Sequence, residues 1–231
     1  MADLVQHRRS LGWWSLALGI AATLKWYYSV AAVTQLGWML EPITWLLRLL
    51  TGWHFRVTAD GEWQSLDAGI VLVKACAGIN FMIMSLLAWC WVIGPRARKL
   101  NRVAWLVEWL TLLLAAVALA WLTALCVNTL RIVAVVCLQP ALERWLAPES
   151  AHRMLGLMIY LPALCAQVLL SEPPRRDRAL LVVCAIYAGV MLLVPLLTGN
   201  AWANPAFYCE HAVLSLAILI PLAGAAIVRR G

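Results

Sequence analysis

The chain has 231 residues, of which 64% are hydrophobic and 13% are charged, and its formal net charge is +7. Soluble domains are about 45–50% apolar and about 25% charged, so this chain has too few polar residues to cover a water-facing surface. The composition excludes a soluble globular enzyme, a disordered chain and a nucleic-acid-binding domain. It indicates an integral membrane protein formed by a single domain over residues 1–231, with basic loops that orient it.

The apolar segments, taken in chain order, predict an all-α membrane bundle. A hydrocarbon core about 30 Å thick needs roughly 20 apolar residues per helix. Six segments reach this length, and we expect each to span the membrane: Leu11–Val33, Gly69–Ile93, Val103–Leu138, Ala151–Leu170, Ala179–Thr198 and His211–Val228. A seventh segment, Leu36–Leu50, is shorter and contains Glu41, Pro42 and Arg48, which favours a re-entrant or interfacial helix.

One polar segment, Gly52–Asp67, lies between the seventh segment and the second expected span. It contains Asp60-Gly61, a dipeptide typical of tight turns between antiparallel strands. We therefore expect a small hairpin outside the membrane.

The basic residues predict the orientation. Eleven of them fall before, between or after the expected spans: Arg8, Arg9, Arg96, Arg98, Lys99, Arg102, Arg175, Arg176, Arg178, Arg229 and Arg230. If Leu36–Leu50 does not span, all four basic segments face the cytoplasm, as cytoplasmic loops usually do. Six spans with both termini cytoplasmic, in the cytoplasmic (inner) membrane, is the consistent topology.

The seven cysteines do not have the spacing of a disulfide framework or of a zinc site. Most are expected to be small apolar packing residues. A cysteine with a chemical role must therefore be identified by its neighbours.

Ionisable residues inside spans are candidates for function. Lys25, Lys74 and Glu108 lie where their side chains can snorkel to a membrane surface. Arg131 lies about 42 Å from the cytoplasmic end of the third span, and His152 opens the fourth span from outside. Cys76 is expected about 10 Å below the outer start of the second span. A thiol, a guanidinium and an imidazole thus come from three helices at a similar depth.

These three groups suit nucleophilic catalysis. A cation beside a thiol favours the reactive thiolate, and an imidazole can take the thiol proton and later deliver it to a leaving amine. A fixed guanidinium can stabilise a developing oxyanion. Each residue alone has a plain structural explanation, as packing residue or interface anchor.

Three local motifs carry a resemblance. Cys76-Ala77-Gly78, Asn128-Thr129-Leu130-Arg131, and His152 followed by Gly156 occur in this order on successive spans. Together they resemble the exosortase/archaeosortase family of polytopic membrane transpeptidases, and the chain length is similar to that of short exosortases such as the K type. Two positions depart from the family pattern: Ala77 replaces a common Ser or Thr, and Asn80 replaces a common Arg.

The resemblance implies a cysteine protease or transpeptidase that acts on exported proteins. Their C-terminal sorting signal would combine a short motif, a membrane helix and a basic tail, and would be cleaved at the outer face of the membrane. Cys76 would form a thioester, His152 would be general base and acid, and Arg131 would stabilise the oxyanion or orient the thiolate. An amine acceptor carried by a membrane lipid or a glycan would resolve the thioester, and no metal or organic cofactor is required.

Two further residues, Asn128 and Asn80, are expected to bind substrate, and Asn128 could instead hold the Arg131 guanidinium, since positions three apart share a helix face. Glu149 or Glu210 could orient His152, and the spacing does not choose between them. Two other functions stay open. One is a non-catalytic transporter or an assembly partner in surface polysaccharide export, and the other is an acyltransferase that uses His152. A transporter is less favoured because no internal repeat is visible.

Overall fold

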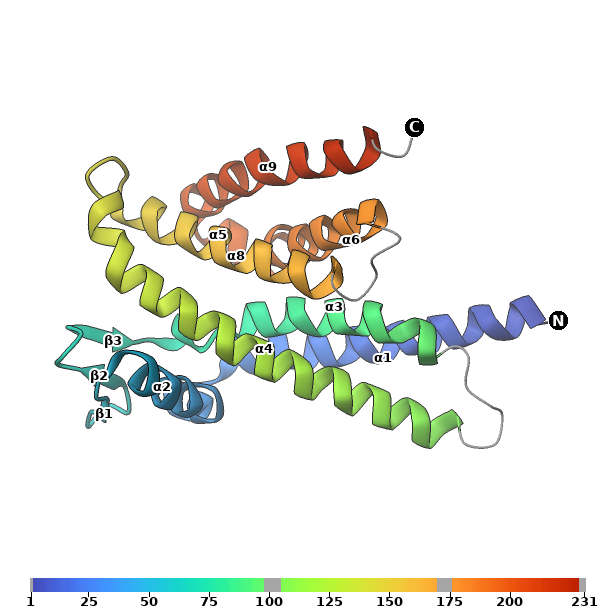
Figure 1. Cartoon of the computed structure of the whole chain (residues 1–231), viewed down its shortest axis with the longest axis horizontal. Helices are drawn as coiled ribbons and strands as arrows, with labels where there is room; N and C mark the ends of the chain where they lie inside the picture. The colour runs from blue at the N-terminus through green and yellow to red at the C-terminus, as the bar shows by residue number, and fades with distance from the viewer. Residues whose placement is uncertain (1, 98–104, 170–175, 229–231) are drawn as a thin grey trace.

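The computed structural model describes residues 2–97, 105–169 and 176–228, and the chain forms an all-α bundle with one small sheet at one end (Figure 1). Six basic residues used to predict the orientation lie outside the described residues: Arg98, Lys99, Arg102, Arg175, Arg229 and Arg230. The first part of the chain contains α1 (Ala2–Val30), η1 (Val33–Leu36), α2 (Gly37–Thr51), β1 (Arg56–Val57), β2 (Trp63–Ser65), β3 (Ile70–Leu72) and η2 (Lys74–Ala77). The rest contains α3 (Ile79–Ala97), α4 (Trp105–Leu142), α5 (Pro148–Leu169), α6 (Arg176–Ala188), the π-helical η4 (Gly189–Leu193), α7 (Val194–Leu197), α8 (Asn200–Ala203) and α9 (Pro205–Val228).

Among the described residues, five segments are long and apolar enough to cross a membrane: Lys74–Gly94, Val107–Leu142, Pro148–Leu169, Arg178–Leu197 and Pro205–Val228. They correspond to the second to sixth expected spans, so a multi-pass membrane protein is confirmed. The first expected span lies in α1, which has 29 residues and is about 43 Å long. It is long enough to cross but is not among the five apolar segments, so its crossing stays a prediction.

Helix α3 occupies the centre of the bundle and packs against α1, α4, α5 and α6. From Phe81 to Ile93 its residues are apolar on all sides except for Ser85, as expected for a helix that is surrounded by others. Phe81, Met84 and Leu86 are fully buried. One polar contact fixes α5 to it, because the Gln167 amide donates to the Ser85 carbonyl at 2.8 Å and accepts from the Ser85 hydroxyl at 3.1 Å. Hydrogen bonds of this kind hold membrane helices together.

The polar segment after α2 forms the expected hairpin and also a third strand. Strands β1 and β2 pair antiparallel around the turn, where Gly61 has a φ of +78°. Strand β3 then pairs with β2, with Trp63 opposite Leu72. Close by, Asp67 accepts hydrogen bonds from the backbone and the ring of His54, at 2.8 and 3.0 Å.

The third strand corrects the expected start of the second span. Residues from Gly69 onward were expected to be helical, but Ile70–Leu72 form β3 and the α-helix begins only at Ile79. Cys76 therefore lies in a 3₁₀ turn before α3, and the expectation that it lies about 10 Å below the start of a helix is wrong.

Helix α2 has 15 residues and is not among the segments long and apolar enough to cross. This agrees with the expected re-entrant or interfacial helix. Its buried residues Met39, Ile43 and Leu47 recur every four positions, so one face packs against α4 and η2.

The first helix begins and the last helix ends on the same side of the molecule. Figure 1 shows the beginning of α1 and the end of α9 at one end of the molecule, and the sheet and the α4–α5 connection at the other. This arrangement agrees with termini on the same side of a membrane. The side that they face stays a prediction.

Candidate active site

Cys76 lies in the tight turn η2, where its backbone N–H donates to the Val73 carbonyl at 2.8 Å. Gly78 ends this turn with a φ of +69°, a conformation that favours glycine. A Cβ at Gly78 would stand 2.7 Å from Cγ of Asn128. The glycine is therefore needed for both its backbone angle and its closeness to α4, and it places the half-buried Cys76 beside that helix.

Asn128 connects this turn to two helices. It is fully buried on α4, its Nδ2 donates to the Cys76 carbonyl at 2.5 Å, and its Oδ1 accepts from the Tyr160 hydroxyl of α5 at 2.7 Å. Both ends of the amide are thus engaged, and Asn128 fixes the backbone of the thiol residue. The alternative that Asn128 holds the Arg131 guanidinium is wrong.

Arg131 and His152 meet directly. Nη2 of Arg131 lies 2.6 Å from Nε2 of His152, and Nδ1 of His152 lies 3.3 Å from Oε1 of Gln139. A guanidinium only donates, so Nε2 must accept, and the ring proton must then be on Nδ1, facing the Gln139 oxygen. The Gln139 amide in turn donates to Glu143 at 2.6 Å. The network assigns a neutral His152 with its proton on Nδ1.

This network identifies the group that orients His152. Neither Glu149 nor Glu210, the two candidates from the sequence, contacts its ring within the described part of the chain. Gln139 does so, with Glu143 behind it. Glu210 pairs instead with Arg153, at 2.5 Å, and this ion pair links α5 to α9.

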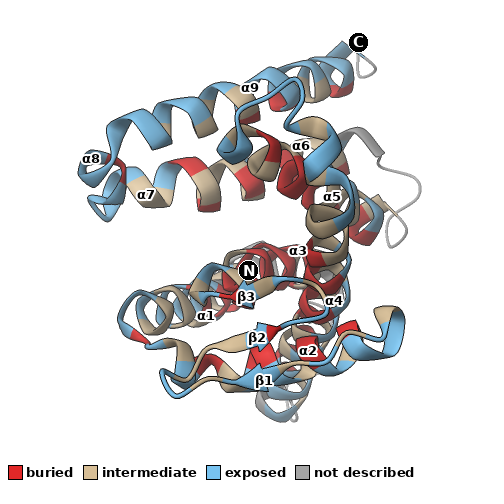
Figure 2. Cartoon of the chain, turned by 90° about the vertical axis from the view of Figure 1, so that its left-hand side faces the viewer, coloured by how far each residue is buried: buried red, intermediate tan, exposed pale blue. Residues whose placement is uncertain are grey.

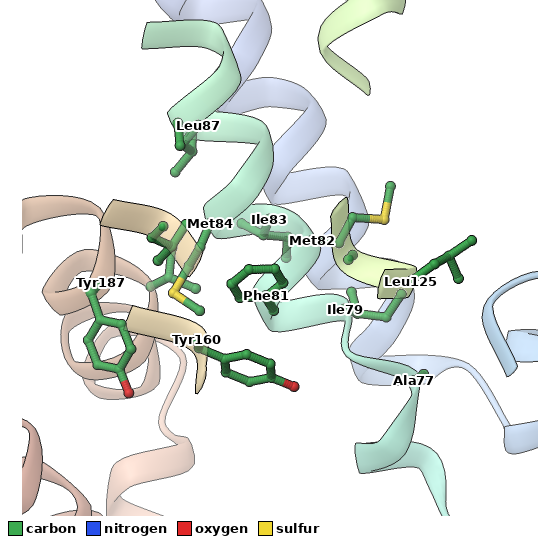
Figure 3. Packing of buried hydrophobic residues seen from close by; sticks show 14 of the residues in the cluster. Ala77, Ile79, Phe81, Met82, Ile83, Met84, Leu87, Leu125, Tyr160 and Tyr187 are labelled. Atoms are coloured by element: carbon green, nitrogen blue, oxygen red, sulfur yellow. The ribbon is translucent and has the colours of Figure 1, made fainter. Parts of the chain in front are cut away.

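The Arg131 side chain lies in a mostly enclosed position. Its Cζ is 5.5 Å from the centre of the Tyr160 ring, which itself stacks on Phe81 at 4.5 Å (Figure 3). A Cβ at Gly156 would be 3.3 Å from Arg131 Nε. The glycine one turn after His152 therefore gives the guanidinium room to lie across α5. Arg131 Nε is buried and has no hydrogen-bond partner in the described residues, so one donor is available.

The structure brings Cys76 to the same group of residues. Arg131 is close enough to interact electrostatically with the thiol. The thiol also interacts with the backbone of Val73, and no hydrogen bond joins it to His152 among the described residues. The contacts connect Cys76 to Arg131 through Asn128 and Tyr160, whose ring centre lies 5.5 Å from the guanidinium carbon, whereas the sequence predicts only a similar depth for the three candidate residues.

Asn80 does not join this cluster. It lies in the first turn of α3, and its Oδ1 accepts from Nζ of Lys25 at 2.8 Å. Lys74 donates to the Ser29 carbonyl at 3.1 Å, where α1 ends. Substrate binding by Asn80 stays a prediction, and its observed partner is a lysine of α1.

Sequence reasoning missed Tyr160 and Gln139. Tyr160 follows Gly156 by four residues, as Gly156 follows His152, so the three share one face of α5. Likewise, Gln139 is two turns beyond Arg131 on α4. Helical periodicity applied to the candidate residues would have found both.

All seven cysteines are free thiols. Within the described ranges no group of three or more His, Cys, Asp or Glu side chains could hold a metal ion. The arrangement is that of a thiol, a cation and an imidazole, which is suited to attack on a carbonyl carbon. Comparisons with protein-family models, with curated proteins and with solved structures find no match for this chain.

Proposed function

We propose that the protein is a membrane-embedded cysteine protease or transpeptidase of the exosortase type. Its substrates are exported proteins with a C-terminal sorting signal, which it cleaves at the outer face of the cytoplasmic membrane and transfers to an amine acceptor. The observation that carries this proposal is the contact between Arg131 and His152 at 2.6 Å, beside a cysteine whose backbone is held by a buried asparagine. The motif order Cys76, Asn128, Arg131, His152, which resembles that family, supports it.

The position of the site along the helices supports a reaction at a membrane boundary. Arg131 lies about 39 Å along α4 from its first residue, which is more than the roughly 30 Å of a hydrocarbon core. His152 lies in the second turn of α5, after the connection that follows α4. The scissile peptide of a membrane-anchored substrate would meet the site where its own helix leaves the lipid.

The His152–Arg131 contact defines the first step. His152 Nε2 accepts from Arg131 and cannot at the same time accept the Cys76 proton. Entry of the substrate carbonyl draws the guanidinium away, since a developing oxyanion is a better acceptor than a neutral imidazole. Nε2 is then free to take the thiol proton.

The remaining steps follow in order. The Cys76 sulfur attacks the carbonyl carbon, and Arg131 stabilises the negative charge on the oxygen. The C–N bond breaks as His152 returns its proton to the leaving amine, and a thioester remains on Cys76. The acceptor amine attacks the thioester and gives its proton to His152, which reprotonates the departing thiolate. Gln139 and Glu143 hold the ring in position throughout.

The decisive experiment compares Cys76→Ala with Cys165→Ala. Cys165 is a half-buried cysteine of α5 outside the site, so it is a matched control. Each variant is co-expressed with an exported protein that ends in a short motif, a membrane helix and a basic tail. We expect the wild type and Cys165→Ala to shorten this protein, and Cys76→Ala to leave it full-length.

A second readout is a covalent adduct between Cys76 and the substrate that neutral hydroxylamine releases, as it releases a thioester. Accumulation of this adduct when the acceptor amine is depleted would support transfer. Normal processing by Cys76→Ala, or an adduct on another cysteine, would overturn the assignment of Cys76 as the nucleophile. Failure of the wild type to shorten the substrate would overturn the proposed activity and favour a non-catalytic role in transport or assembly.

A further inference from the structure

A second feature of the molecule is a cavity of about 820 Å³ whose lining includes neither Arg131 nor His152. One wall is α1 and the other is the run η4–α7, while Ile83 and Leu87 of α3 form the floor. Figure 2 shows α7 and α8 facing α1 across the open side of the molecule. Leu18, Trp26 and Leu193 line it and are about half exposed or more, so the cavity opens sideways, toward the lipid of a membrane.

The lining has one polar end. Along most of its length it is apolar, and its polar lining residues are Lys25 and Ser29, in the last two turns of α1, and Thr198 and Asn200, around the junction of α7 and α8. The α1 wall runs from Trp14 to Ser29, about 22 Å along the helix. The site is thus a long apolar groove with hydrogen-bonding groups and one cation at one end.

Lys25 has no carboxylate within ion-pair distance in the described residues. Its Nζ donates to the neutral Asn80 and lies 5.9 Å from the centre of the Tyr28 ring. A half-buried cation among apolar helices is unfavourable without a counter-charge. An anionic group in the groove would supply that charge.

The size of the groove suits a lipid. Ligand cavities in proteins measure about 300–1,000 Å³, and this one lies within that range. An acyl chain is narrower than a helix and fits a groove about 22 Å long. The cation at one end distinguishes an anionic lipid from an apolar helix, which would bring no counter-charge to Lys25.

We propose that this groove binds a phospholipid with an anionic headgroup, with its phosphate against Lys25 and its acyl chains between α1 and η4–α7. Basic pockets between membrane helices bind anionic lipid headgroups in this way. The π-helical turn η4 forms part of the wall, and such turns are frequent at functional sites. The bound lipid lies between α1 and the η4–α7 run, and the proposal that it binds there does not rest on the thiol chemistry proposed above.

Native mass spectrometry of the full-length protein in detergent tests the proposal, with palmitoyl-oleoyl phosphatidylglycerol against phosphatidylcholine of the same chains. We expect one tightly held phosphatidylglycerol, and a loss of affinity of about five- to tenfold in Lys25→Gln. Lys25→Arg keeps the charge and should keep the lipid. Lys74→Gln is the matched control, since Lys74 is also near the end of α1 but does not line the groove.

A fourth variant, Ala22→Trp, places a large side chain in the groove from an exposed lining position, and should displace both lipids. Equal binding of the two lipids by the wild type, or an equal loss in Lys25→Gln and Lys74→Gln, would overturn the anionic assignment. Inorganic phosphate alone should not compete. Preference for a polyprenyl phosphate, or for an apolar 20-residue helical peptide that Ala22→Trp excludes, would assign the groove to a different occupant and also overturn the proposal.

Discussion

Substitution of Gly156 by alanine should raise stability and lower activity. In a helix, alanine is more favourable than glycine by up to about 1 kcal/mol. The added Cβ would stand 3.3 Å from Arg131 Nε, which is closer than an ordinary van der Waals contact. The guanidinium would have to move by a few tenths of an ångström to relieve this contact. A misplacement of about 1 Å at an active site costs about 100-fold, so a shift of about 0.3 Å predicts a loss of about fourfold.

The control for this change is Gly224→Ala on α9, because a Cβ there meets nothing within 4 Å. It should raise the melting temperature by about 2–4 °C with unchanged activity. Thermal melting measures stability, initial rates of substrate shortening measure activity, and ¹⁵N NMR of the His152 ring reports its contact with Arg131. If Gly156→Ala gained as much stability as Gly224→Ala and kept full activity and an unchanged His152 spectrum, the assigned role of Gly156 would be refuted.

Two further predictions concern the turns around the sheet end. Gly78→Ala should destabilise the protein by about 1–2 kcal/mol because of the positive φ, and further because the new Cβ overlaps Asn128. Gly52→Ala, at a φ of +79° with open space around it, should show only the first effect. Equal losses of melting temperature in the two variants would contradict the overlap. The hydrogen bonds from His54 hold the pKa of the Asp67 carboxyl below its ordinary value. They therefore stabilise the fold at any pH above the unfolded pKa, and this stabilisation is lost as the pH falls through the lower pKa of the folded state. Asp67→Asn should therefore be less stable than wild type at neutral pH, and the difference should disappear once the pH has fallen below the lowered folded pKa of Asp67. A difference that persists in strong acid would argue against this assignment.

The helices that cross the membrane could be predicted from the sequence because about 20 consecutive apolar residues have few other stable arrangements. The start of the second span could not, since Ile70, Val71 and Leu72 suit a strand as well as a helix. Their state is decided by pairing with Trp63–Ser65, which is a contact between segments. The hairpin turn at Asp60-Gly61 was local and was predicted correctly.

The candidate site could likewise be predicted from the sequence only in part. The approach of Arg131 and His152 followed from counting residues along two successive helices, and the structure brings them together. The role of Asn128 could not be predicted, because helical spacing places it beside Arg131 while its real partner is the Cys76 carbonyl. That contact exists only because Gly78 lets the preceding turn approach α4.

Helix α4 has 38 residues and is about 57 Å long, nearly twice the thickness of a hydrocarbon core. Because Asn128 and Arg131 lie on this one helix, their height relative to the hydrocarbon core, in the topology that the sequence predicts, is set by a residue count and not by a loop. A bilayer thicker by about 5 Å would cover one more helical turn and exclude water from the guanidinium. In that topology, membrane thickness and the hydration of this site are coupled, and a change in acyl-chain length would act on the proposed chemistry without touching a side chain.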